Sequence, residues 1–155
     1  MSSDYFTTFS AELDRILIEL HALQEQKERY QQEIARLEAD GCVHGNIVTE
    51  RRGGNGPYYR LTFYTDPATG KKPKPVYIGT DAERRARVEQ QITNHQERLG
   101  LQEAVARISL VLGNALRRVE DLRGYLVNQN TKPFLCQLVI PAALAANGGN
   151  TKSEG

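Results

Sequence analysis

The chain has 155 residues, of which 39% are hydrophobic and 25% are charged, and its formal net charge is +1. This length suits one ordinary domain, or a small domain joined to a helical arm. A net charge so close to zero excludes a protein that binds nucleic acid over its whole surface, so any such attraction must come from local clustering. No apolar run reaches the roughly 18–20 residues of a membrane span, and the start lacks the regions of a secretory signal. We therefore expect a cytoplasmic protein without a membrane partner.

No residue pattern in the chain indicates catalysis or a cofactor. The two cysteines, Cys42 and Cys136, lie far apart, and Cys42 with His44 supplies only two of the four ligands that a structural metal site needs. The segment 53–56, GGNG, has neither the spacing nor the context of a phosphate-binding loop and is read as a turn. No nucleophile stands with a base, and no carboxylates are paired. We expect no metal, no cofactor and no enzymatic activity.

Residues 5–40 are predicted to form one long helix. Its apolar residues recur at alternating spacings of four and three, which is typical of a left-handed coiled coil, and Lys27 occupies one of these positions. A polar residue there costs stability but can fix the register of the helices. Gly41 is the expected stop. The residues of this pattern are Phe9, Leu13, Ile16, Leu20, Leu23, Lys27, Tyr30, Ile34 and Leu37.

Residues 81–127 are predicted to form a second helical region, capped by Thr80 or Asp81 and kinked or briefly broken near Gly100. After Gly100 a new heptad pattern runs through Leu112 and Val119. The simplest arrangement is an antiparallel pair of helices. Because one pair buries only one stripe, a homo-oligomer is expected and a dimer is favoured, although the same pattern also arises from ordinary core packing. The residues expected to mediate oligomerisation are Leu13, Ile16, Leu20, Leu23, Lys27, Ile34, Leu112 and Val119.

Residues 44–80 are predicted to form a three-stranded antiparallel sheet between the helices, which gives an α+β fold. The expected strands are 45–51, 57–65 and 74–79, because four prolines between residues 57 and 75 exclude a single helix. In the second strand Tyr59, Leu61 and Phe63 alternate with polar residues, so they should face a common core, with Val76 and Ile78 of the third strand beside them. The helix after Asp81 should cover this face. A turn with Gly70 in a left-handed conformation should join the last two strands.

The other face of this sheet carries tyrosines and basic residues. Residues 44–79 contain six basic residues against two acidic ones, a net charge of +4 in a chain whose total is +1. Arginine and lysine neutralise phosphates, and a twisted β-ribbon fits the major groove of DNA. An equally weighted alternative is a soluble sheet whose charged edges prevent aggregation. The residues expected to bind nucleic acid are Arg51, Arg52, Tyr58, Arg60, Thr62, Tyr64, Lys71, Lys72, Lys74 and Tyr77.

Residues 45–92 resemble the arm-type three-stranded DNA-binding domain of tyrosine recombinases. The similarity rests on Gly45, on the strand from Tyr58 to Tyr64, on Asp66 with Gly70 and Lys71, and on the strand from Lys74 to Gly79 before a charged helix. It implies a sheet that enters the major groove of DNA. The chain lacks the Arg/His/Tyr set of the recombinase catalytic domain, so the resemblance implies docking without recombination. The G-P-Y-Y strand is also similar to that of uncharacterised small bacterial coiled-coil proteins.

Residues 128–155 differ in character from the helices before them. Prolines bracket an apolar, strand-like segment, Phe134–Ile140, which is expected to pack on the helices and could alternatively bind a protein partner. A disordered tail should follow it. The sequence as a whole favours a non-enzymatic DNA-binding oligomer, such as a mobile-element or accessory regulatory factor. Its main rival is a coiled-coil scaffold or adaptor that binds another protein through the sheet.

Overall fold

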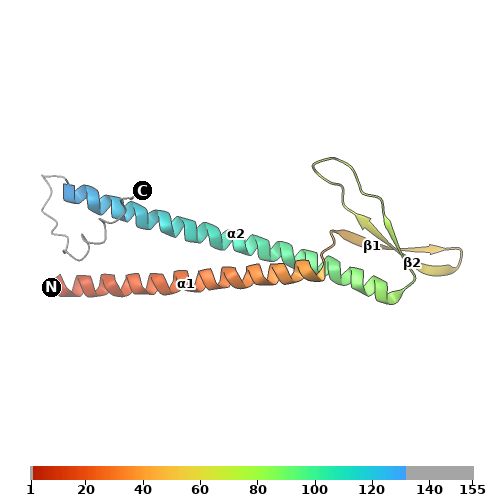
Figure 1. The fold of residues 1–155 in the computed structure, drawn as a ribbon, viewed down its shortest axis with the longest axis horizontal. Coiled ribbons are helices and arrows are strands. Elements are labelled where there is room, and N and C mark those ends of the chain that lie inside the picture. Colours follow the sequence, from red (N-terminus) through yellow and green to blue (C-terminus); the bar gives the residue numbers. More distant parts are fainter. Residues whose placement is uncertain (1, 132–155) are drawn as a thin grey trace, which may run out of the picture. The chain divides into compact units, whose positions relative to one another are not determined.

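The computed structural model describes residues 2–131, which form two α-helices and one three-stranded sheet. The α+β fold is confirmed, while the apolar segment Phe134–Ile140 and the predicted tail lie outside the described residues. The chain divides into two units, residues 1–112 and residues 113–155, and the packing described below belongs to the first. Along the chain (Figure 1) the elements are α1 (Ser2–Asp40), β1 (Gly45–Arg52), β2 (Asn55–Phe63), β3 (Val76–Gly79) and α2 (Ala82–Thr131).

The sheet is antiparallel, with strand order β1-β2-β3. β1 and β2 pair from Gly45 opposite Phe63 to Arg52 opposite Asn55, so only Gly53 and Gly54 separate the strands at the tip. Both glycines have positive φ, 56° and 78°, as a two-residue type I′ hairpin requires. The two glycines thus form the tight turn of the hairpin, and the pairing register shifts by one residue between Glu50 and Arg52.

One face of the sheet is covered by the first turns of α2, as the alternation in β2 predicted. Arg85 strengthens this contact: its guanidinium carbon lies 4.4 Å from the ring centroid of Tyr59, and its Nη1 donates to the Tyr59 hydroxyl at 3.0 Å. The sheet is therefore held on α2 by apolar burial and by a cation–π contact. The buried residues of this core are Tyr59, Leu61 and Ile78, with Val43, Ile47, Phe63, Val88 and Ile92 packed around them.

The third strand differs from the prediction in its extent and in the exposure of Val76. β3 has four residues and begins at Val76, so Lys74 precedes it. Tyr59 pairs with Gly79 and Arg60 pairs with Tyr77, which makes Ile78 the extra residue of a bulge. Ile78 is 3% exposed, whereas Val76 is 45% exposed at the start of a short edge strand. Val76 pairs with Leu61 and so has the predicted face, but at the start of this edge strand it remains largely exposed and outside the buried core.

The predicted end of the first helix and start of the second are confirmed. Gly41 has a φ of +99° and its amide donates to the Leu37 carbonyl at 3.1 Å, which ends α1. The Asp81 carboxylate accepts hydrogen bonds from the amides of Glu83 (2.9 Å) and Arg84 (3.4 Å), so Asp81 rather than Thr80 caps α2. α2 then runs as a single helix through Gly100, and the short break expected there is not present within Ala82–Thr131.

The end of α1 is tied to α2 by a buried side chain. Asn94 is 4% exposed, and its Nδ2 donates to the Gly41 carbonyl at 3.1 Å while its Oδ1 accepts from Gln90 Nε2 at 2.9 Å. Two residues after Gly41, the Val43 amide donates to the Gln91 carbonyl of α2 at 3.0 Å. Two hydrogen bonds thus anchor the segment between α1 and β1 on α2, and the bond from Gln90 holds the Asn94 side chain in place.

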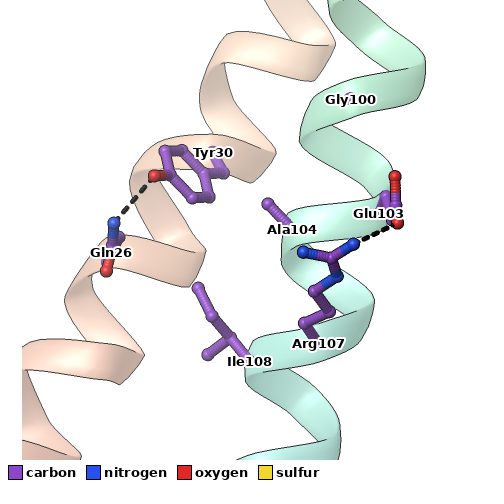
Figure 2. A pocket seen from close by; sticks show the side chains of 7 residues that line it. All are labelled: Gln26, Tyr30, Gly100, Glu103, Ala104, Arg107 and Ile108. Carbon is purple, nitrogen blue, oxygen red and sulfur yellow. Dashed lines mark hydrogen bonds and ion pairs between the residues drawn. The ribbon is translucent and has the colours of Figure 1, made fainter.

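α1 and α2 lie side by side over part of their lengths. Arg98 Nη1 lies 3.1 Å from Glu38 Oε1, and Leu37 and Ile108 are buried. Beyond Arg98 the packing opens into a cavity of about 270 Å³ between the helices, towards which Tyr30 and Ile108 point (Figure 2). Its lining residues are Gln26, Tyr30, Gly100, Glu103, Ala104, Arg107 and Ile108.

Several residues expected to mediate oligomerisation remain accessible. Leu13 and Ile16 of α1 are 42% and 45% exposed, and Val119 of α2 is also exposed. Leu20, Leu23, Lys27, Ile34 and Leu112 are partly buried. The described residues 2–131 show no packing that covers these exposed side chains. The coiled-coil seam therefore stays a prediction. No helix in these residues is long and apolar enough to cross a bilayer.

We predict that Asn94→Ala lowers the free energy of unfolding by about 1–3 kcal/mol, because it leaves the Gly41 carbonyl without its partner. Urea unfolding followed by circular dichroism measures this difference. The matched control is Asn114→Ala, at an exposed position of the same helix, where alanine should be neutral or slightly stabilising. Equal losses in the two variants would contradict an anchoring role for Asn94.

Candidate nucleic-acid interface

The second face of the sheet, which we call the outer face, is built from residues that pair across the strands. Glu50 of β1 lies opposite Tyr58 of β2, and Arg60 of β2 lies between Val48 and Tyr77. Directly paired residues point to the same side of a sheet, so these five side chains share the outer face. The predicted grouping of Tyr58, Arg60 and Tyr77 therefore follows from the observed register.

The outer face is hollowed at its centre. A concavity of about 330 Å³ is lined by Glu50, Arg52, Tyr58, Arg60 and Tyr77, four of which were predicted to bind nucleic acid. The rings of Tyr58 and Tyr77 lie 6.3 Å apart with their planes inclined by 34°. The concavity thus combines cationic, anionic and aromatic groups within a small area.

Glu50 bridges both arginines of this concavity. Its Oε2 accepts from Arg60 Nη2 at 3.0 Å and from Arg52 Nη2 at 3.3 Å. Sequence reasoning counted the charge of Glu50 but missed its position, which depends on the strand register. Two cations and one anion leave a net charge of +1 here, so the centre is far less positive than the number of arginines suggests.

Two predicted residues lie away from the centre. Thr62 donates its hydroxyl hydrogen to the Asn46 carbonyl at 3.1 Å, which ties its side chain to the neighbouring strand. Tyr64 follows the end of β2, and its ring centroid lies 4.5 Å from that of His44. His44 in turn stacks on His95 of α2 at 4.7 Å. Tyr64 therefore belongs to an aromatic cluster at the base of the sheet, and Thr62 has a structural partner.

The remaining predicted residues lie at the two ends of the sheet. Arg51 is exposed beside the hairpin tip, and it has the parity of Ile47, which faces α2. Lys71, Lys72 and Lys74 are exposed in the loop between β2 and β3. The structure thus gathers four of the predicted residues in the concavity and separates the lysines from them along the chain.

The lysine-bearing loop has an internal framework centred on Asp66. The Asp66 carboxylate accepts from the Ala68 amide and from the Thr69 hydroxyl, both at 2.9 Å, and these bonds hold the pKa of Asp66 below its ordinary value. The Asp66 backbone also bonds to Gly70 (2.8 Å) and to Lys71 (3.0 Å). Gly70 has a φ of +65°, as predicted for this turn. Hydrogen bonds within the loop therefore order the backbone next to the lysines.

The stacked pair of His44 and His95 is a feature that sequence reasoning missed. Burial, the nearby His44 and the guanidinium of Arg98 lower the pKa of His95. Arg98 Nη2 lies 3.3 Å from His95 Nδ1. The spacing of 51 residues between the two histidines carries no sequence signal, because only the turn after Gly41 and the docking of β1 on α2 bring them together.

Comparisons with protein-family models, with curated protein sequences and with solved structures find no match to this chain. The similarity of residues 45–92 to recombinase arm domains therefore stays an expectation. Within residues 2–131 no group of three or more histidine, cysteine or acidic side chains lies close enough to hold a metal ion. The outer face and the lysine loop are the candidate site that the geometry offers.

We predict that stability falls as the pH is lowered from about 7 towards 5. The pKa of His95 is lower in the folded chain than in the unfolded chain, so the unfolded state takes up its proton first on acidification. Stability is therefore lost as the pH falls below the unfolded value of about 6.5, until the folded value is reached. Melting temperatures of the unmodified chain and of His95→Gln across this range test the prediction. The variant should show a shallower decline, and parallel curves would count against it.

Proposed function

We propose that this chain is a non-enzymatic, oligomeric DNA-binding protein that presents the outer face of its sheet to duplex DNA. The observation that carries this proposal is the convergence of Arg52, Tyr58, Arg60 and Tyr77 in one concavity, beside a loop with three exposed lysines. Phosphate contacts position a protein on DNA, and contacts to base edges read its sequence. The basic groups at the margin of this face suit contacts to phosphates, and the mixed polar groups at its centre suit contacts to base edges.

The charges support a specific assignment of the contacts. No acidic residue lies between Asp66 and Asp81 in the chain, and both of these carboxylates are engaged, that of Asp66 within the loop and that of Asp81 at the start of α2. The three lysines are therefore free to neutralise phosphates and to release counterions. Glu50 repels phosphate from the centre, where Arg52 and Arg60 are already paired. In our proposal the loop binds the backbone of the DNA and the centre contacts bases.

A second candidate function is that of an adaptor which binds another protein through the outer face. The ion-paired centre with two tyrosines favours it, since tyrosine and arginine are enriched where protein interfaces concentrate their binding energy. A nearly neutral concavity of this kind also suits a peptide. The two candidates differ in the role of the lysine loop, which only the DNA proposal requires.

We infer that the helices bring together two copies of the chain, as the heptad pattern predicts. Few apolar side chains of α1 are buried within the described residues, and its first half carries exposed Phe6, Phe9, Leu13, Ile16 and Leu17. Such a face is costly to leave in water, and a second copy supplies an apolar surface of the same pattern. A dimer would also present two sheets to a duplex, which raises affinity through bivalency.

We predict that the unmodified chain retards duplex DNA at low salt and that Lys71→Gln/Lys72→Gln/Lys74→Gln weakens this binding. Each lost phosphate contact should reduce the slope of log K against log salt concentration by up to about one unit. Fluorescence anisotropy over a salt series measures both quantities. No binding of any duplex at low salt would exclude the DNA proposal and favour the adaptor.

The matched control for the lysine variant is Arg117→Gln/Arg118→Gln/Arg123→Gln. It removes the same charge from exposed positions of α2. Under the proposal this control keeps most of the affinity, because its arginines lie outside the sheet and its loop. An equal loss in both triple variants would show that binding depends on total charge and would contradict the assignment to the loop.

We predict that Leu13→Gln/Ile16→Gln converts a dimer into monomers at micromolar concentration without unfolding them. Both side chains are about half exposed in the single chain, so their loss should cost the association more than the fold. Light scattering after size exclusion gives the mass, and circular dichroism gives the helix content. The control Glu12→Gln/Asp14→Asn alters exposed residues of the same turns and should stay dimeric. A monomeric unmodified chain would contradict the inference.

A further inference from the structure

Glu50 and Arg60 place hydrogen-bond donors and an acceptor side by side on the outer face. Arg60 Nη2 lies 3.0 Å from Glu50 Oε2, and the two side chains are 33% and 30% exposed. Arg52, which binds the same oxygen, is 73% exposed. Glu50 and Arg60 are thus partly desolvated and hold each other in place, while Arg52 bonds to Glu50 from a mostly exposed position.

Both members of the pair retain bonding capacity. Arginine has five N–H donors, and the bond to Glu50 uses one of those on Nη2. Within the described residues, the hydrogen bonds to the Glu50 carboxylate are made by Oε2, so Oε1 can accept another. The pair therefore offers two adjacent donors from one guanidinium and one acceptor next to them.

This order of donors and acceptor matches one base pair. In the major groove, guanine presents two neighbouring acceptors, N7 and O6, and its partner cytosine presents the N4 amino donor. Arginine binds the guanine edge with two parallel hydrogen bonds, and glutamate accepts from cytosine N4. An adenine–thymine pair offers the arginine no two neighbouring acceptors on one purine.

We propose that Arg60 and Glu50 together read a guanine–cytosine base pair in the major groove, with Arg60 on the guanine and Glu50 on the cytosine. The inference rests on the DNA-binding function proposed above and assigns sequence specificity to it. The salt bridge aligns Arg60 before DNA arrives. A carboxylate would only weaken a site for phosphate. In this proposal Glu50 instead contributes to binding, because it accepts a hydrogen bond from cytosine.

Two other uses of the concavity fit its geometry less well. A phosphate at its centre would meet the Glu50 carboxylate beside both arginines. A single unpaired base held between Tyr58 and Tyr77 needs parallel walls, but these rings are inclined by 34°. Recognition of a base-pair edge uses the donors and the acceptor as they stand.

The test begins with selection of the full-length chain on a pool of randomised duplexes, followed by anisotropy measurements on the selected duplex and on its single base-pair changes. We expect one or more positions at which guanine–cytosine is preferred by about tenfold or more. Arg60→Lys keeps the charge but loses the two parallel donors, so this preference should fall about tenfold with little change in salt dependence. Selection of adenine–thymine, or of single strands, would overturn the proposal.

Glu50→Gln separates base reading from charge. Removing the carboxylate should raise the affinity for all duplexes a few-fold. It should also reduce the preference for guanine–cytosine at the base pair that depends on Arg60. The control Glu25→Gln removes the same charge from an exposed position of α1 and should leave the preference unchanged. If Glu50→Gln and Arg60→Lys both keep the full ranking of sequences, the pair does not read bases, although the DNA-binding function would stand. If no duplex binds, both proposals fail.

Discussion

The hydrogen bond between the Asn94 side chain and the Gly41 carbonyl is the contact on which the first unit depends. Gly41 is partly buried and Asn94 is buried, so the side-chain amide of Asn94 supplies the hydrogen bond that the carbonyl at the end of α1 accepts. Four residues after Gly41, β1 begins, so the direction in which the sheet leaves the helix is set at this point. The outer face owes its orientation to an interaction on the opposite side of the sheet.

The charges of the sheet are sorted by distance from its centre. Glu50 compensates part of the charge of Arg52 and Arg60, whereas the lysines stand in a loop whose one acidic residue is already engaged. In the proposed function, long-range attraction comes from the margin and short-range discrimination from the centre, where partial desolvation strengthens each hydrogen bond. The same sorting would serve a protein partner with an acidic rim and a polar core.

The sequence predicted the elements of this fold better than the contacts between them. Alternation in β2 and the glycines and prolines around it identified the sheet, and Gly41 and Asp81 identified helix ends, because these signals are local. The bulge at Ile78 and the bridging position of Glu50 depend on register, which parity in one strand does not determine. Asn94 looks like a surface residue within a helical pattern. Its burial could be found only by knowing where α1 ends.

The hydrogen bonds around Asp66 bear on the entropy of binding. A flexible lysine-rich loop would lose backbone freedom whenever it met a partner, at a cost of about 1–2 kcal/mol for each residue fixed. Here the backbone from Asp66 to Lys71 is already closed by its own bonds, so that cost is met during folding. Lys71, at the end of this closed segment, therefore has mainly side-chain motion left to lose on contact.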